Sequence, residues 1–125
     1  AKIVTGAVAA NNPETFDGDI SGWLGDGAGL WQIGQPTSGP GIAHSGNNVA
    51  ATNLYGNYSP ASVARLQGPP LQLGTGPLLT LRWWQWYQFG TGDRGDVQIS
   101  VSDGTTWSDW VTLATVNGSS GAWQQ

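Results

Sequence analysis

Hydrophobic and polar side chains alternate along several short stretches of this chain, a pattern typical of β-strands. In the stretch 78–89, every second residue from Leu79 to Phe89 lies on one face of the predicted strand. The stretch 96–102 alternates in the same way, with aliphatic side chains on one face and polar ones on the other. Because successive side chains of a strand point to opposite faces, one face of each strand is predicted to meet a core. The predicted core residues are Leu79, Leu81, Trp83, Val97, Ile99 and Val101.

Further short strands are predicted along the rest of the chain. Two lie within 14–31, where aromatic-bearing segments are separated by Gly-Asp turns, and others cover 48–54, 63–67 and 107–116. The segment 32–46 is predicted to be a long irregular loop, because it holds too much Pro and Gly for regular structure. About seven short strands without a notable helix favour a sandwich or a barrel.

The composition indicates one small domain. A chain of 125 residues fits a single domain, and its 20 Gly and seven Pro interrupt helices too often for long ones to form. No internal repeat is visible, which argues against a solenoid or a propeller. We predict that residues 14–125 form one β-sandwich module and that residues 1–13 are a linker or an extra N-terminal strand.

Charge and residue usage exclude several kinds of partner. Four basic residues face eight acidic ones, so the chain has no basic surface that would favour nucleic acid. No apolar run of about 18 residues is present to cross a membrane. The chain has neither Cys nor Met, and only 10% of its residues are charged. This composition suits an extracellular bacterial protein, and we predict that the protein is secreted.

No catalytic constellation emerges from the sequence, and we predict that the chain is not an enzyme. The single histidine, His44, lies in a Pro- and Gly-rich loop, and without cysteine it cannot belong to a zinc cluster of the usual kind. The neighbouring Ser45 does not make a catalytic triad, because adjacent residues rarely point at one another. The tripeptide Arg94-Gly95-Asp96 matches a known adhesion motif, but three residues recur by chance, and we interpret its charges as solvated turn residues.

Oxygen-bearing side chains are the candidate metal ligands. Asp17 and Asp19 flank a glycine in one turn, Asp93 lies in a later turn, and Asn53 offers a side-chain carbonyl between them. Oxygen ligands of this type suit Ca²⁺, which takes six to eight of them in flexible geometry. The alternative is that Asp-Gly pairs only form turns.

Tryptophan is the candidate residue for binding a ligand. The chain has eight Trp, more aromatic area than a small core needs. Trp84 and Trp86 lie two residues apart on one predicted strand, and Trp110 lies on another, so all three are candidate platforms for sugar rings. This favours a carbohydrate-binding module as the alternative function. Burial of these residues is the competing interpretation.

Several motifs in order resemble one family of extracellular modules. They are Phe16-Asp17, the loop motifs at 38–40 and 44–46, Thr52-Asn53-Leu54, Gly56-Asn57-Tyr58, and the segment 93–100. Together they resemble the MAM-like, cleaved-adhesin-like jelly-roll modules that accompany immune inhibitor A-type and subtilisin-like peptidases of bacteria. The resemblance extends from Glu14 to Trp123.

This resemblance implies an all-β, antiparallel two-sheet jelly-roll sandwich with calcium bound near the first strand. Asp17 is the ligand best matched to the family pattern, followed by Asp19, Asn53 and Asp93. The implied function is a non-catalytic, calcium-stabilised accessory or adhesion module of a secreted multidomain bacterial protein. Its expected partners are other domains of that protein and a polysaccharide or protein ligand.

Members of this family normally continue beyond a segment such as Trp123-Gln124-Gln125 with further strands. The resemblance therefore implies a sandwich that lacks its last strands. We expect strand complementation by a complementary C-terminal fragment or by exchange between copies, because an open sheet edge accepts another strand. The alternative is that residues 3–8 close the edge.

Overall fold

The computed structural model describes residues 13–26, 30–72 and 80–125. Within these ranges the chain forms six strands and no helix, and every strand pairs with an antiparallel neighbour. The described part contains no helix that could span a membrane. The predicted all-β, antiparallel fold class is confirmed, and the paired strands are consistent with a small β-sandwich.

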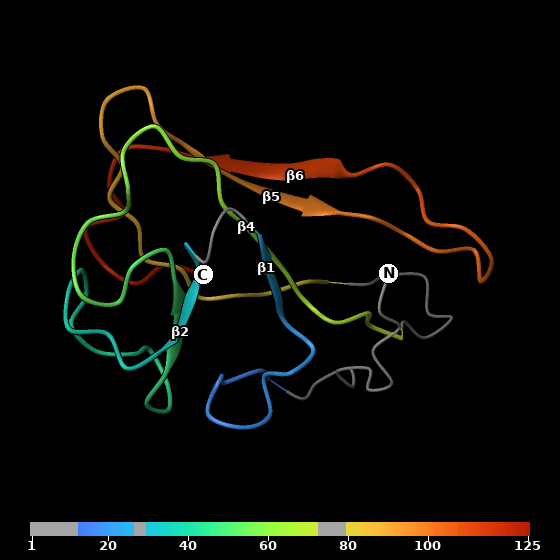
Figure 1. The fold of residues 1–125 in the computed structure, drawn as a ribbon, viewed down its shortest axis with the longest axis horizontal. Coiled ribbons are helices and arrows are strands. Elements are labelled where there is room, and N and C mark those ends of the chain that lie inside the picture. Colours follow the sequence, from blue (N-terminus) through green and yellow to red (C-terminus); the bar gives the residue numbers. More distant parts are fainter. Residues whose placement is uncertain (1–12, 27–29, 73–79) are drawn as a thin grey trace. The chain divides into compact units, whose positions relative to one another are not determined.

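The chain divides into two compact units, each of which is described by itself. The first unit comprises Ala1–Trp84 together with Gln125, and the second comprises Gln85–Gln124. The first holds two of the three two-stranded sheets and the second holds the third (Figure 1).

Two short strand pairs organise the first unit. Strand β1 (Leu24–Asp26) pairs with β4 (Arg65–Gln67), and β2 (Gln32–Gly34) pairs with β3 (Val49–Ala51). At one end of the first pair, Asp26 accepts hydrogen bonds from the Arg65 amide at 3.1 Å and from its guanidinium at 3.4 Å. Strands were predicted near β1, β3 and β4, and the structure places strands there.

The buried hydrophobic residue of the described part is Leu54, which is 4% exposed. Its amide donates to Gln32 Oε1 at 2.8 Å, and its carbonyl accepts from the amides of Thr37 and Ser38 at 2.8 and 3.2 Å. A β-carbon on Gly34 would lie 3.0 Å from Leu54 Cδ1, so glycine leaves room for this side chain. The long loop therefore wraps around Leu54.

The prediction that residues 32–46 contain no regular structure was wrong at their start. Gln32–Gly34 form β2, with Ile33 opposite Ala50 and Gly34 opposite Val49. The physical reason is the partner strand β3. Its backbone forms hydrogen bonds with the amides and carbonyls of β2, although the Gly- and Pro-rich sequence around β2 does not favour a strand.

Strands β5 (Gly95–Ile99) and β6 (Val111–Val116) form the sheet of the second unit (Figure 1). On its polar face, Thr115 donates to Asp96 Oδ1 at 2.7 Å and Gln98 donates to Thr112 at 3.0 Å. The register shifts between Val97, which faces Ala114, and Gln98, which faces Thr112. Leu113 is therefore the extra residue of a β-bulge.

The long strand predicted over 78–89 is not continuous. Residues 73–79 lie outside the described part, and residues 80–89 make only isolated bridges, in which Gln85 pairs with Gln124 and Gln88 with Ser119. The partner segment contains Gly118 and Gly121 with φ of 66° and 68°. These left-handed residues turn the partner away from an extended path, so a regular ladder cannot form.

The predicted core is only partly correct. Trp83, Val97 and Ile99 are half-buried, but Leu81 and Val101 are 53% and 54% exposed. Leu79 lies outside the described residues. Leu81 is exposed because residues 80–84 belong to no strand, and Val101 because β5 ends at Ile99. Period-two alternation places side chains on a face, but burial needs a second layer over that face.

Candidate functional site

Asp17, the first candidate calcium ligand, anchors a distant loop. Its Oδ1 accepts hydrogen bonds from the amides of Asn47 at 3.1 Å and Asn48 at 3.0 Å, and its Oδ2 accepts from Asn47 at 3.2 Å. The Asn48 side chain in turn donates to the Phe16 carbonyl at 2.9 Å. The segment 16–17 is thereby tied to a loop thirty residues further along the chain.

The same segment is held from its other side by aromatic and acidic contacts. The Phe16 ring lies 4.9 Å from that of Trp23, and the Phe16 amide donates to Glu14 Oε1 at 2.6 Å. Phe16 has φ of 60°, a left-handed conformation that is uncommon for a residue other than glycine. The ring contact with Trp23 and the hydrogen bond to Glu14 therefore hold the turn that carries Asp17.

The other three candidate ligands take part in turns. Asp19 Oδ1 accepts from the Ser21 amide at 2.9 Å, and this bond lowers the pKa of the Asp19 carboxyl. Asn53 accepts from the Tyr55 amide at 2.9 Å and donates to the Asn57 carbonyl at 2.8 Å. Asp93 belongs to the second unit, where its amide donates to Gly90 at 3.1 Å.

The described residues do not by themselves form a metal cage. Across 13–26, 30–72 and 80–125, no three side chains of His, Cys, Asp or Glu are grouped to hold a metal ion. Calcium takes six to eight oxygen ligands, and the Asp17 carboxylate is engaged with backbone amides. The calcium site stays a prediction.

The three candidate tryptophans have different environments. Trp84, in the first unit, is 45% exposed and stacks on His44, with ring centroids 3.8 Å apart and ring planes 13° apart. Trp86 and Trp110 belong to the second unit, where Trp86 is half-buried and Trp110 is 53% exposed. One ring face of Trp84 is therefore covered by His44.

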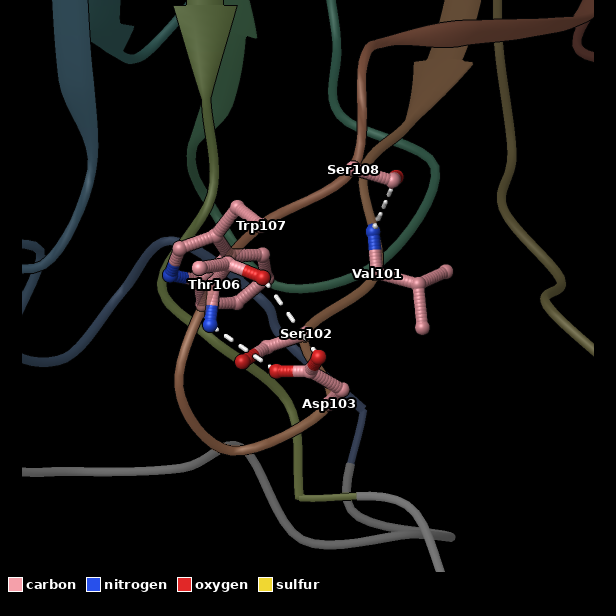
Figure 2. A pocket seen from close by; sticks show the side chains of 6 residues that line it. All are labelled: Val101, Ser102, Asp103, Thr106, Trp107 and Ser108. Carbon is pink, nitrogen blue, oxygen red and sulfur yellow. Dashed lines mark hydrogen bonds between the residues drawn. The ribbon is translucent and has the colours of Figure 1, made fainter.

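Sequence reasoning missed a surface hollow in the second unit, just beyond the end of β5 (Figure 2). Its volume is about 350 Å³. The residues that line it are Val101, Ser102, Asp103, Thr106, Trp107 and Ser108. The sequence signal for it is the segment Ser102–Trp107, whose Asp-Gly pair is typical of a turn.

A network of short-range hydrogen bonds shapes this hollow. Asp103 Oδ1 accepts from the amides of Thr105 and Thr106, each at 2.8 Å, and closes the turn. Above the turn, the Val101 amide donates to Ser108 Oγ at 3.0 Å, and the Ser108 amide donates to the Val101 carbonyl at 2.8 Å (Figure 2). The backbone on both sides of the turn, at Val101 and at Ser108, is therefore held in place.

The hollow combines one acid with one aromatic ring. The amides of Thr106 and Thr105 lower the pKa of the Asp103 carboxyl below its ordinary value, which favours the charged form. Trp107 is 59% exposed, although tryptophan is usually largely buried. Ser102, Thr106 and Ser108 add hydroxyl groups. Among the described residues, the hollow is lined by one carboxylate and by no histidine.

Comparison with known proteins finds a similar region in a much longer protein. It is similar to Bacillopeptidase F of Bacillus subtilis (strain 168), with 29% identity over 119 residues. The similarity covers 94% of this chain but only 8% of that protein. No family model matches the chain. No solved structure matches it either.

Proposed function

We propose that this chain is a non-catalytic accessory module of a larger, secreted protein. The observation that carries the proposal is the extent of the similarity, because nearly the whole chain corresponds to a small part of a protein named as a peptidase. Such a region is large enough for one folded domain and too small a share of the relative to be the complete protein.

The site geometry supports a binding or supporting role. The chain has a single histidine, and its ring stacks on Trp84 in the first unit. The described residues that line the hollow of the second unit include one carboxylate, whose Oδ1 closes a turn. Catalysis by a triad or by two carboxylates needs several groups directed at one point. These arrangements favour a module without its own reaction.

Two measurements test this proposal. An antibody raised against the chain should detect, in the culture medium of the source organism, a polypeptide much larger than the 13.1 kDa of this chain. The purified chain should not hydrolyse labelled casein or chromogenic esters and glycosides above the buffer rate. Turnover that is lost in the variants His44→Ala or Asp103→Asn would contradict the non-catalytic role, and detection only inside cells would contradict secretion.

The alternative function, sugar binding through Trp84, Trp86 and Trp110, receives less support from their surroundings. Stacking platforms are aromatic faces open to solvent. His44 covers one face of Trp84, and Trp86 is half-buried. Trp110 keeps the required exposure, but it does not line the hollow.

A further inference from the structure

We propose that the hollow formed by residues 101–108 is a carbohydrate-binding subsite in which Trp107 stacks on a sugar ring and Asp103 accepts a sugar hydroxyl. Neither Trp107 nor Asp103 is among the binding candidates that the sequence pattern indicated, which were Trp84, Trp86 and Trp110. This inference goes beyond the proposed function and does not depend on it, because a module without sugar affinity can still be a non-catalytic part of a larger protein.

The aromatic part of the subsite is an exposed indole on a fixed backbone. Trp107 is 59% exposed and pairs with Ser102 in an antiparallel bridge. Tryptophan offers a large flat apolar surface at little conformational cost. The C–H face of a pyranose ring is apolar, so it packs against such a surface while its hydroxyl groups remain free for hydrogen bonds.

The polar part of the subsite is the carboxylate of Asp103. Its Oδ1 is occupied by the amides of Thr105 and Thr106, whereas Oδ2 accepts the Thr106 hydroxyl at 3.4 Å. A carboxylate oxygen can accept about two hydrogen bonds. Oδ2 therefore has acceptor capacity for a ligand hydroxyl, and a hydrogen bond to a charged oxygen is stronger than one between neutral groups.

The size of the hollow limits the ligand. Ligand pockets usually measure about 300–1,000 Å³, and this one is about 350 Å³. It suits one or two sugar units of a longer chain. Because the turn and the bridge already hold its walls, little conformational entropy is lost when a ligand binds.

Other ligand chemistries fit the hollow less well. An anionic ligand would meet the charge of Asp103 in a chain of net charge −4. Recognition of an organic cation typically uses a cage of several aromatic rings, and within the described part of the chain Trp107 is the one aromatic residue that lines this hollow. The Thr106 and Ser108 hydroxyls already donate to Asp103 Oδ2 and to the Asp109 carbonyl. The Ser102 hydroxyl accepts from the Gly104 amide and can still donate to a ligand. Together with the acceptor Asp103 Oδ2, it offers the donor and acceptor that a polyhydroxylated ligand requires.

Three variants of the full chain test the proposal. Trp107→Ala removes the stacking surface. Asp103→Asn keeps an oxygen for the turn amides but replaces the carboxylate charge and one acceptor. Tyr55→Ala is the control, because Tyr55 is an aromatic residue that is 69% exposed and does not line the hollow. Amide NMR spectra of each variant show whether the fold is retained.

Each protein is titrated, by amide NMR, with soluble hexasaccharides of glucose, xylose and N-acetylglucosamine, and separately with hexalysine. We expect saturable shifts of residues 101–108 with at least one saccharide. Trp107→Ala should weaken this binding about tenfold or more, Asp103→Asn should weaken it several-fold, and Tyr55→Ala should leave it unchanged. Absence of binding to all three saccharides, binding that survives Trp107→Ala, or binding of hexalysine alone would overturn the proposal. None of these results bears on catalytic turnover or secretion.

Discussion

The carboxylate of Asp17 lies so close to Gly46 that a β-carbon at position 46 would overlap Asp17 Oδ2. The next two amides, those of Asn47 and Asn48, donate to the same carboxylate. Gly46 also has φ of 65°, which side-chain-bearing residues rarely adopt. The contact between Asp17 and its loop therefore depends on glycine for two separate reasons.

The first prediction concerns the substitution Gly46→Ala. A positive φ costs a residue with a β-carbon about 1–2 kcal/mol, and the overlap with Asp17 adds to this cost. Gly41→Ala is the matched control, because Gly41 has φ of 73° and no atom within 4 Å of an added β-carbon. Urea denaturation should show a larger loss of unfolding free energy for Gly46→Ala. Equal losses would mean that the Asp17 contact contributes nothing.

The second prediction concerns the buried side chain of the first unit. Leu54 is 4% exposed, so Leu54→Ala should lower the free energy of unfolding by about 2–5 kcal/mol through lost burial and a residual cavity. Leu71, which is 46% exposed, provides the control. Thermal and urea denaturation should both show a much smaller effect for Leu71→Ala, and similar effects of the two substitutions would contradict the assignment of Leu54 as the core.

The third prediction is a loss of stability in acid. The hydrogen bond from Thr115 is the main reason that the pKa of Asp96 is lowered from 3.8, and the charge of Arg94 lowers it further. A carboxyl whose pKa is lower in the folded state stabilises the fold above its unfolded pKa. This contribution is lost as the pH falls from 3.8 through the folded value. The pKa values of Asp19 and Asp103 are also lowered, so these two carboxyls add to the loss of stability in acid.

Asp96→Asn and Thr115→Val should each reduce the difference in stability between about pH 6 and about pH 3. The first removes the titrating group, and the second removes its main hydrogen-bond donor. Urea denaturation at the two pH values measures this difference. An acid sensitivity identical to that of the unmodified chain would show that the pair of Asp96 and Thr115 has no role in it.

The fourth prediction concerns calcium. If calcium binds at the first turn, it stabilises the folded state by mass action, by about 2.7 kcal/mol at a hundredfold excess over its dissociation constant. The thermal midpoint should then rise in calcium and fall in chelator. Asp17→Asn retains an oxygen for the loop amides but loses the charge, so it should abolish the response. An unchanged midpoint in the unmodified chain would leave Asp17 as a loop anchor alone.

The features that depend on neighbouring residues could be predicted from the sequence. Alternation over 96–99 predicted β5, and the half-buried Val97 and Ile99 lie on the face that the pattern indicated. The Asp-Gly sequence at 103–104 predicted a turn, since an aspartate side chain can accept the amides that follow it. The side-chain alternation of a strand and the hydrogen bonds of a short turn depend only on residues that are close in sequence.

Only the tertiary structure decided which distant segments meet. The sequence around Asp17 suggested a cation ligand. It does not reveal that the Asp17 carboxylate accepts hydrogen bonds from the distant amides of Asn47 and Asn48. The hollow was missed for a different reason, because its residues are local but its shape depends on the pairing of Val101 with Ser108 across the turn, which the alternation pattern does not reveal. Val101 was predicted to be buried, yet it lies at an exposed position beyond the end of β5. A periodic pattern determines where a side chain points, whereas burial and binding depend on atoms that other parts of the chain bring to it.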